Sequence, residues 1–310
     1  PELRRLGYSG ALSTGALAAG GTLGILIPPS VILIIYSILT EQNIAKMFLC
    51  AFIPGLLAAL GYIVAISLYV RLNQNSGPIK DRIPWKDRMY LFKNIWHIIL
   101  IFVVMIGGIY MGFFTPTEGA AIGAAGTGII AITNKSFNIK SFIEVIESTA
   151  VTTGMIFFVL LGAEFFNSFI ALTQLPNLLT EFSKENNLEP LIVVACIMIL
   201  YLFLGCLMDS LAMILLTIPV FFPLVMSLDF GLSPEETAIW FGILTLVVVE
   251  VGLITPPVGL NVFIINKMAK DVPIIDTFKG VIPFLLSDII RIILLFSFPS
   301  ITLIMLWAFY

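Results

Sequence analysis

The sequence predicts an all-α polytopic membrane protein whose two halves are inverted repeats with broken helices. Of its 310 residues, 59% are hydrophobic and 11% are charged, whereas a soluble domain carries about a quarter charged residues. The apolar runs are too long for the strands of a membrane barrel, so they indicate spanning helices. In addition, two of these runs are interrupted by a Pro-Pro pair in the same local pattern.

The composition excludes several functional classes. The formal net charge is −3 and no basic face is present, which argues against nucleic-acid binding. Cys50, Cys196 and Cys206 show no paired spacing, so they are interpreted as small apolar residues. No nucleophile–base pair, metal cluster, P-loop or dinucleotide motif appears. We therefore expect neither enzyme activity nor an organic cofactor.

The two Pro-Pro pairs lie at residues 28–29 and 256–257, and a glycine lies four residues before the first proline of each. Proline has no N–H, so each pair removes the helical donor of two earlier carbonyl groups. In hydrocarbon such backbone must be buried in protein or line a cavity. Free carbonyls suit a cation there, and broken helix ends attract ionic solutes. The carbonyl groups concerned belong to Gly24, Ile25, Gly252 and Leu253.

The likeness between the two segments continues downstream. Each is followed by a polar break and then by an Ile-Pro dipeptide, Ile53-Pro54 or Ile282-Pro283, that opens a new apolar run. Two interrupted segments at corresponding positions of two halves indicate the binding site of a transporter. The alternative is a pair of Pro-kinked helices with packing roles alone.

The first predicted elements are a run of small residues at 9–20, which suits close helix packing, and an arm at 25–39. Residues 46–70 are predicted to span the membrane. The loop 71–93 carries an excess of Lys and Arg, which places it in the cytoplasm, and residues 94–114 span outward.

The middle of the chain restarts at residues 115–118, Thr-Pro-Thr-Glu, which predict a capping box. A helix of small residues follows at 117–132, and residues 141–172 hold an interfacial start and a spanning helix. Within that helix, Glu164 is expected to face a helix interface. The acidic loop 173–190 is placed outside.

The last third holds apolar segments at 190–228 and 239–266, broken at 205–210 and at the second Pro-Pro pair. The stretch 267–279 is rich in Lys and is placed in the cytoplasm, and residues 281–308 form the final span. The helix after the first Pro-Pro pair therefore ends in the cytoplasm, and the helix after the second starts there. This inversion is expected of alternating-access transporters.

Several side chains near the breaks are candidates for binding. Asp209 lies between apolar runs, where a carboxylate is functional by default, although it also suits the N-cap of the next helix. Glu250 would either coordinate a cation or, as we favour, pack against a cationic side chain. Asp288 and Arg291 lie three residues apart and are expected to pair.

Neutral oxygens dominate the candidate site, and they suit Na⁺ better than a divalent ion. The candidates for substrate and ion binding are Thr22, Gly24, Pro28, Pro29, Ser30, Gly205, Met208, Asp209, Ser210, Gly252, Thr255, Pro256, Pro257, Gly259 and Asn261. The candidate Na⁺ ligands are Gly24, Ile25, Gly252, Leu253, Thr255 and Asp209.

Four motifs in this order resemble the large membrane subunit of TRAP (tripartite ATP-independent periplasmic) transporters. They are Gly21–Ser30, Phe114–Glu118, Gly205–Ser210 and Gly252–Asn261, and the match runs across the whole chain. The resemblance implies a Na⁺-driven importer of organic acid anions in the bacterial inner membrane. Sialic acid, which overall likeness favours, and C4-dicarboxylates are the substrate types. The implied partners are a small membrane subunit, separate or fused, a periplasmic substrate-binding protein and the lipid bilayer.

The resemblance also implies an elevator-type transporter, in which a transport domain with two re-entrant helical hairpins slides against a scaffold. Residues 1–45 and 141–275, with the second hairpin at about 205–260, are assigned to the transport domain, and 46–140 and 276–310 to the scaffold. The outer arm of the first hairpin is expected upstream of residue 1, so we expect this chain to be the C-terminal part of a larger protein. The alternative within transport is a stand-alone Na⁺/carboxylate symporter without a binding protein.

Overall fold

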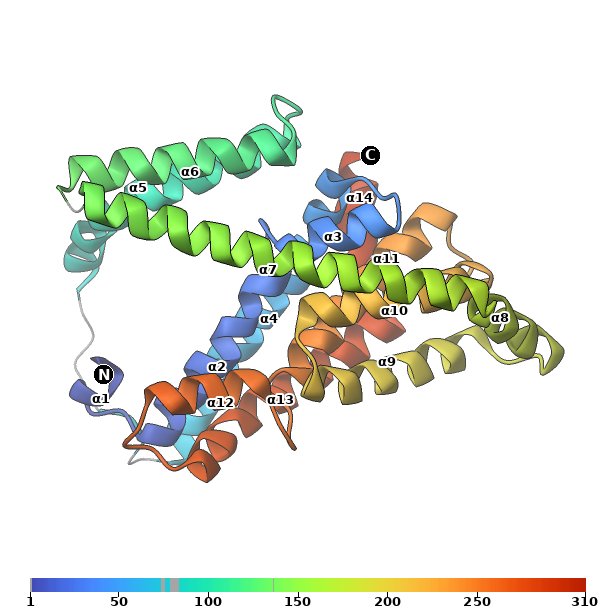
Figure 1. Ribbon diagram of the computed structural model, residues 1–310. Coiled ribbons are helices and arrows are strands. Elements are labelled where there is room, and N and C mark those ends of the chain that lie inside the picture. The colour runs from blue at the N-terminus through green and yellow to red at the C-terminus, as the bar shows by residue number, and fades with distance from the viewer. Residues whose placement is uncertain (1, 74–75, 79–83, 136) are drawn as a thin grey trace. The chain divides into compact units, whose positions relative to one another are not determined.

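The computed structural model describes residues 2–73, 76–78, 84–135 and 137–310, and every regular element in them is a helix (Figure 1). Five segments of the described chain are long and apolar enough to cross a membrane, which confirms the predicted all-α polytopic fold. The helices are α1 (Glu2–Arg5), α2 (Gly10–Leu26), α3 (Val31–Leu39), α4 (Ile44–Leu72), α5 (Trp85–Tyr110), α6 (Pro116–Thr133), α7 (Ile139–Leu172), α8 (Leu175–Glu185), α9 (Pro190–Leu207), α10 (Ser210–Met226), α11 (Pro234–Gly252), α12 (Leu260–Met268), α13 (Ile274–Ser297) and α14 (Pro299–Phe309).

The chain divides into two compact units. The larger comprises residues up to Pro78 and from Ala163 onward, and the smaller comprises the residues between them. In the smaller unit, α5 and α6 pack side by side, and α6 begins with the predicted capping box of Thr115 and Glu118. Its glycines face α5 closely, since a Cβ on Gly119 would lie 2.8 Å from Ile109 Cδ1.

Helix α11 forms the centre of the larger unit, because every residue from Thr237 to Gly252 is buried. A helix that is apolar all round must be enclosed by others, and α2, α3, α4, α9, α10, α13 and α14 all pack on it. The indole N–H of Trp240 donates to the carbonyl of Leu295 at 2.9 Å, which ties the buried helix to α13.

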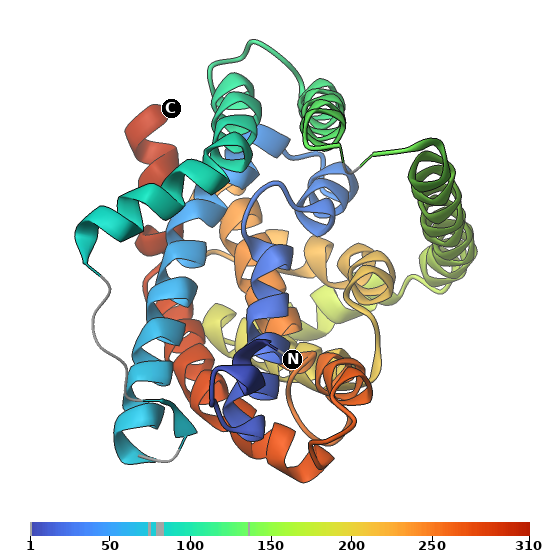
Figure 2. The same ribbon diagram turned by 90° about the vertical axis from the view of Figure 1, so that its left-hand side faces the viewer.

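The two Pro-Pro segments lie in matching structural contexts. In each, a long helix (α2 or α11) ends, the chain breaks, a helix of nine residues follows (α3 or α12), and another long helix begins (α4 or α13). Helix α2 packs on α12 and α13, and α11 packs on α3 and α4. The long helix before each break therefore packs on the two helices that follow the other break, as expected of two structural repeats. Figure 2 shows α2 in blue between α4 and the orange α12.

Small residues let α2 and α13 approach closely, as residues 9–20 predict. A Cβ on Gly280 would lie 1.9 Å from the carbonyl oxygen of Ala11, and one on Gly15 would lie 2.3 Å from the carbonyl carbon of Gly280. Only glycine fits at either position. Close backbone approach of this kind is a common basis of helix association in membranes.

A side chain on α7 compensates for a proline in α10. Pro219 has no N–H, so the carbonyl of Leu215 lacks its helical donor. The Asn167 amide nitrogen donates to that carbonyl at 3.3 Å, and thereby joins the C-terminal part of α7 to α10.

Several sequence predictions differ from the structure. The expected loop 173–190 contains the amphipathic helix α8, whose apolar residues recur at helical spacing although the stretch was interpreted from its acidic charge alone. The expected final span, 281–308, divides into α13 and α14, because Pro299 disfavours helical backbone at Phe298. Glu164 is exposed in this structure and does not face a helix interface.

The predicted cytoplasmic loop 71–93 is shorter than expected, because α4 extends to Leu72 and α5 already begins at Trp85. Pro84 lies immediately before α5, where its fixed φ and missing N–H are tolerated. The charged residues Lys80, Asp81 and Arg82 of this loop lie outside the described residues.

Candidate functional site

The first break comprises residues 27–30, between α2 and α3. Ser30 is the N-cap of α3, because its Oγ accepts from the Leu33 N–H at 3.3 Å. The same hydroxyl donates to the carbonyl of Ile25, which lost its helical donor to Pro29. One turn earlier, the buried Thr22 hydroxyl donates to the Ala19 carbonyl at 2.8 Å.

The second break comprises residues 253–259, between α11 and α12. The hydroxyl of Thr255 donates to the carbonyl of Val251 at 2.6 Å, which leaves its lone pairs available as acceptors. Gly259 has a left-handed φ of 61°, which glycine adopts at no steric cost. This backbone turns the chain from the break into α12.

The carbonyl groups freed by the second Pro-Pro pair find new donors, contrary to the expectation that they stay unpaired. The Gly252 carbonyl accepts from the Thr255 N–H at 3.1 Å, and the Leu253 carbonyl accepts from the Asn261 N–H at 3.0 Å. The loop curls back on the helix end, which sequence spacing does not reveal. Each carbonyl still has a second lone pair for a ligand.

The last turn of α9 lies directly against the end of α11 and the second break. A Cβ on Gly252 would lie 2.6 Å from the Gly205 Cα, so the two backbones touch. The thiol of Cys206 lies 3.7 Å from the carbonyl oxygen of Pro256. Two predicted motifs, far apart in the sequence, therefore meet here, while the contact of Cys206 was not foreseen.

Asp209 caps α10, as one of its two interpretations predicted. Its Oδ2 accepts from the N–H groups of Leu211 and Ala212 at 3.1 and 3.4 Å. The carboxylate is exposed and Met208 beside it is half-buried. Asp209 therefore keeps an oxygen that is open to a further ligand.

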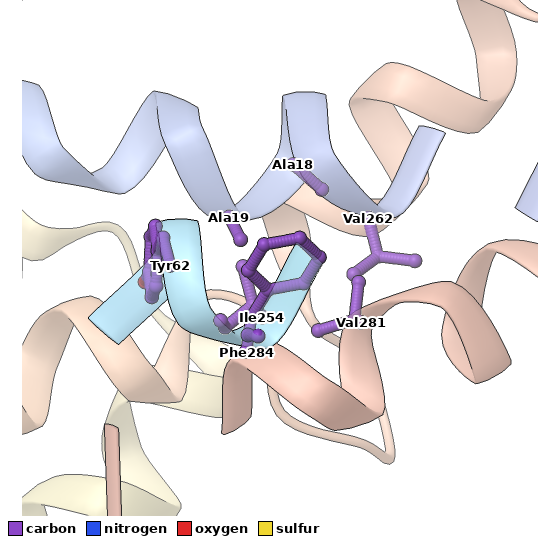
Figure 3. Close-up of a cluster of buried hydrophobic side chains, with 8 residues drawn as sticks. Ala18, Ala19, Tyr62, Ile254, Val262, Val281 and Phe284 are labelled. Atoms are coloured by element: carbon purple, nitrogen blue, oxygen red, sulfur yellow. The ribbon is translucent and has the colours of Figure 1, made fainter. Parts of the chain in front are cut away.

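The second break also contacts α2, which carries the first break at its end. A Cβ on Gly21 would lie 3.9 Å from Asn261 Nδ2. Ile254 is buried with Ala18 and Ala19 of α2 in a cluster that includes Tyr62 and Phe284 (Figure 3). The candidates differ in exposure: Thr22, Pro28, Ser30, Gly205, Ser210, Gly252 and Gly259 are buried, Met208, Thr255 and Asn261 are intermediate, and Gly24, Pro29, Asp209, Pro256 and Pro257 are exposed.

A buried charge cluster lies beside the end of α11. Arg291 Nη2 of α13 is 3.0 Å from Glu250 Oε2 and 3.0 Å from Asp288 Oδ1. The Tyr62 hydroxyl of α4 donates to Asp288 Oδ2 at 2.8 Å. The favoured interpretation of Glu250, packing against a cationic side chain, and the expected pairing of Asp288 with Arg291 are both confirmed. Tyr62 was missed, because nothing in the spacing along the chain links α4 to this cluster.

Comparison with known proteins identifies the family. Residues 1–301 match the family described as the tripartite ATP-independent periplasmic transporter, DctM component. The chain belongs to this DctM family.

Several curated relatives match nearly the whole chain. It is 32% identical to a C4-dicarboxylate TRAP transporter large permease protein of Pseudomonas aeruginosa, over 96% of this chain and 68% of that protein. It is 29% identical to a sialic acid large permease protein of Vibrio cholerae, over 98% of this chain and 69% of that protein. It is 32% identical to the sialic acid permease protein SiaT of Haemophilus influenzae, over 96% of this chain but only 47% of that protein.

Membership of the DctM family confirms several predictions. The relatives are transporter permeases, so the chain is a permease and not an enzyme. The family and the long apolar helices together confirm a multi-pass protein of the bacterial inner membrane.

Proposed function

We propose that this permease imports organic acid anions into the cell by coupling their movement to Na⁺, with Na⁺ bound at the two helix breaks. The observation that carries the proposal is the repeated local structure of these breaks. In both, a Pro-Pro pair follows the end of a long helix, and carbonyl and hydroxyl oxygens lie at that end. Oxygen ligands of this kind suit a hard monovalent cation.

The candidate ligands supply that oxygen set. The carbonyl oxygens belong to the ends of α2 and α11, where the helix dipole places partial negative charge. The Thr255 hydroxyl lies directly after the second helix end, and Asp209 lies two residues after α9, whose last turn packs against that end. Na⁺ is proposed to bind among Gly24, Ile25, Gly252, Leu253, Thr255 and Asp209.

The anion is proposed to bind at the opposite helix ends. The N-termini of α3 and α12 begin directly after the two breaks, and helix N-termini attract negative charge. Ser30 and Asn261 lie at these two helix starts. The remaining candidates for the same site are Thr22, Pro28, Pro29, Gly205, Met208, Ser210, Pro256, Pro257 and Gly259. Relatives named for sialic acid and for C4-dicarboxylates match this chain at 29–32% identity, so identity alone separates neither substrate. We keep sialic acid as the first substrate to test.

The proposed complex is tripartite. A small membrane subunit, separate or fused, and a periplasmic substrate-binding protein would complete the transporter, and the transport domain would move past a scaffold in the manner of an elevator. The domain boundaries predicted from the sequence, at residues 45, 140 and 275, stay proposals. The stand-alone symporter is the second candidate function, and family membership favours the tripartite form over it.

The deciding experiment is uptake into proteoliposomes that contain the complete membrane complex. Labelled sialic acid is supplied with an inward Na⁺ gradient, with the binding protein added or withheld. Uptake that requires both Na⁺ and the binding protein is the expected result. Uptake without the binding protein would favour the symporter, uptake of a dicarboxylate alone would replace the substrate, and uptake indifferent to Na⁺ would refute the coupling.

A further inference from the structure

The buried cluster of Glu250, Arg291, Asp288 and Tyr62 is not explained by substrate or ion binding as proposed above. The side chains of Glu250, Asp288 and Arg291 are 0%, 1% and 4% exposed. A buried ion pair is a costly choice, because apolar residues of similar volume are often equally stable or more stable. Within a membrane, buried ionisable residues most often mark functional positions.

The position of Glu250 connects the cluster to the second break. Glu250 lies two residues before Gly252, the last residue of α11. Its Oε2 is held by Arg291 at 3.0 Å, and Arg291 in turn is fixed by Asp288 at 3.0 Å on the same helix. The end of α11 is therefore attached by an ion pair to α13.

A second connection reaches the break from the other side. Tyr62, which donates to Asp288, also packs edge-on against Phe284 with ring centroids 5.1 Å apart. Phe284 and Tyr62 lie in the apolar cluster that buries Ile254, the second residue of the break (Figure 3). Glu250 and Ile254, on either side of Gly252 and Leu253, are thus fixed by the same two helices, α4 and α13.

We propose that Arg291 is a positioning residue for the second break: through Glu250 it holds the end of α11 so that the carbonyl groups of Gly252 and Leu253 keep the geometry of the cation site. The inference rests on the proposed function for the identity of the ligand, but its structural part stands without it. Arg291 touches neither the cation nor the substrate in this proposal.

The chain carries its own reporter of the geometry at the break. Cys206 is buried, and its thiol lies 3.7 Å from the Pro256 carbonyl. In a background with Cys50→Ala and Cys196→Ser, Cys206 is the one cysteine left among these 310 residues. Its labelling rate with a maleimide then reports loosening of the break, and it requires neither Na⁺ nor transport.

The test variant neutralises the whole cluster, Glu250→Gln/Arg291→Met/Asp288→Asn, because removing Arg291 alone would leave two buried carboxylates without a cation. We expect the triple variant to assemble in the complex, to raise the Na⁺ concentration for half-maximal uptake at least tenfold, and to label Cys206 at least tenfold faster. Arg291→Lys keeps the charge but replaces the planar guanidinium with a compact ammonium on a flexible stem, so it should show both changes in smaller degree.

A matched control comes from an ion pair between α4 and α11. Lys46 of α4 pairs with Glu235 of α11 at 2.7 Å, and Glu235 lies about 22 Å from Glu250 along the helix axis. The double variant Lys46→Gln/Glu235→Gln should leave both readouts unchanged.

The outcomes separate this proposal from the proposed function. If the triple variant labels Cys206 and responds to Na⁺ like the wild type, the cluster does not position the break and its charges only compensate one another. That result would overturn the proposal. If the triple variant fails to assemble, wild-type values for Arg291→Lys would overturn it equally. If wild-type uptake proves independent of Na⁺, the proposed function fails, while faster labelling would still establish Arg291 as the residue that positions the break.

Discussion

At the scale of single residues, Asp209 combines two demands in one side chain. Its carboxylate caps α10 through the N–H groups of Leu211 and Ala212. It is exposed just after α9, whose last turn touches the second break. A cap requires only an acceptor oxygen, which Asn supplies as well as Asp. A cation ligand benefits from the charge, so the two roles separate on substitution.

We expect Asp209→Asn to keep the thermal stability of the complex and to lower Na⁺-driven uptake at least tenfold. Asp209→Ala should in addition lose about 1 kcal/mol of stability, because the cap is removed. Thermal melting and uptake, measured on the same preparations, check both expectations. Full uptake by Asp209→Asn would leave the residue with the cap alone.

Thr255 offers a sharper test, because its hydroxyl is already oriented by the Val251 carbonyl at 2.6 Å. Thr255→Val preserves the shape but removes the oxygen, so the Na⁺ concentration for half-maximal uptake should rise several-fold. Thr255→Ser should remain close to wild type. Thr14, which makes the same bond to Gly10 at 2.9 Å on α2, supplies the control Thr14→Val, for which no change in Na⁺ response is expected.

At the scale of elements, the prolines of α10 show how one helix depends on another. The Leu215 carbonyl, which loses its helical donor to Pro219, accepts across the helix interface from the Asn167 amide at 3.3 Å. An unpaired buried carbonyl costs about 1–3 kcal/mol. The Asn167 hydrogen bond that attaches α7 to α10 therefore compensates for the N–H group that Pro219 lacks.

A double-mutant cycle measures this dependence. Asn167→Ala alone should destabilise the protein by about 1–3 kcal/mol. Pro219→Ala restores the helical N–H, so in that background Asn167→Ala should cost much less. Equal costs in both backgrounds, read from thermal melting in detergent, would show that the amide does not serve the carbonyl.

The elements differ in how far local sequence predicts them. The helix starts at Thr115 and Ser233 and the stops at the Pro-Pro pairs follow from capping and from the missing N–H, which are local effects. The donors that reach the freed carbonyls, and the partner of Glu250, depend on how distant segments pack. The helix α8 was missed although its apolar residues recur at helical spacing, because the stretch was interpreted from its acidic charge alone.

At the scale of the whole molecule, the larger unit unites helices that the sequence assigned to different domains. The breaks, α4 and α13 lie in one compact unit, and the buried contacts of Tyr62, Glu250 and Arg291 join α4, α11 and α13. Breaking a buried ion pair costs about 3–5 kcal/mol. A sliding boundary between these helices would incur that cost in every transport cycle.

A crosslink decides where the moving boundary lies. Cysteines at Lys46 and Glu235, whose side chains meet at 2.7 Å, would join α4 to α11 through a short bifunctional thiol reagent. We expect crosslinked protein to retain uptake, because the buried contacts among α4, α11 and α13 favour joint movement of these helices over the boundary proposed at residue 45. Loss of uptake on crosslinking, restored by a cleavable reagent, would instead support the boundary predicted at residue 45.

The close seam between α2 and α13 has a consequence for synthesis of the chain. Gly15 and Gly280, which meet there, are separated by most of the chain, so at about 5–20 residues per second the ribosome needs roughly a quarter of a minute to a minute to deliver the second after the first. During that interval the glycine-containing face of α2 lies in the bilayer without α13, the helix on which it packs. We therefore expect the nascent chain to be most vulnerable to quality-control proteases before α13 emerges, and ribosome stalling between the codons of Gly15 and Gly280 would prolong that interval.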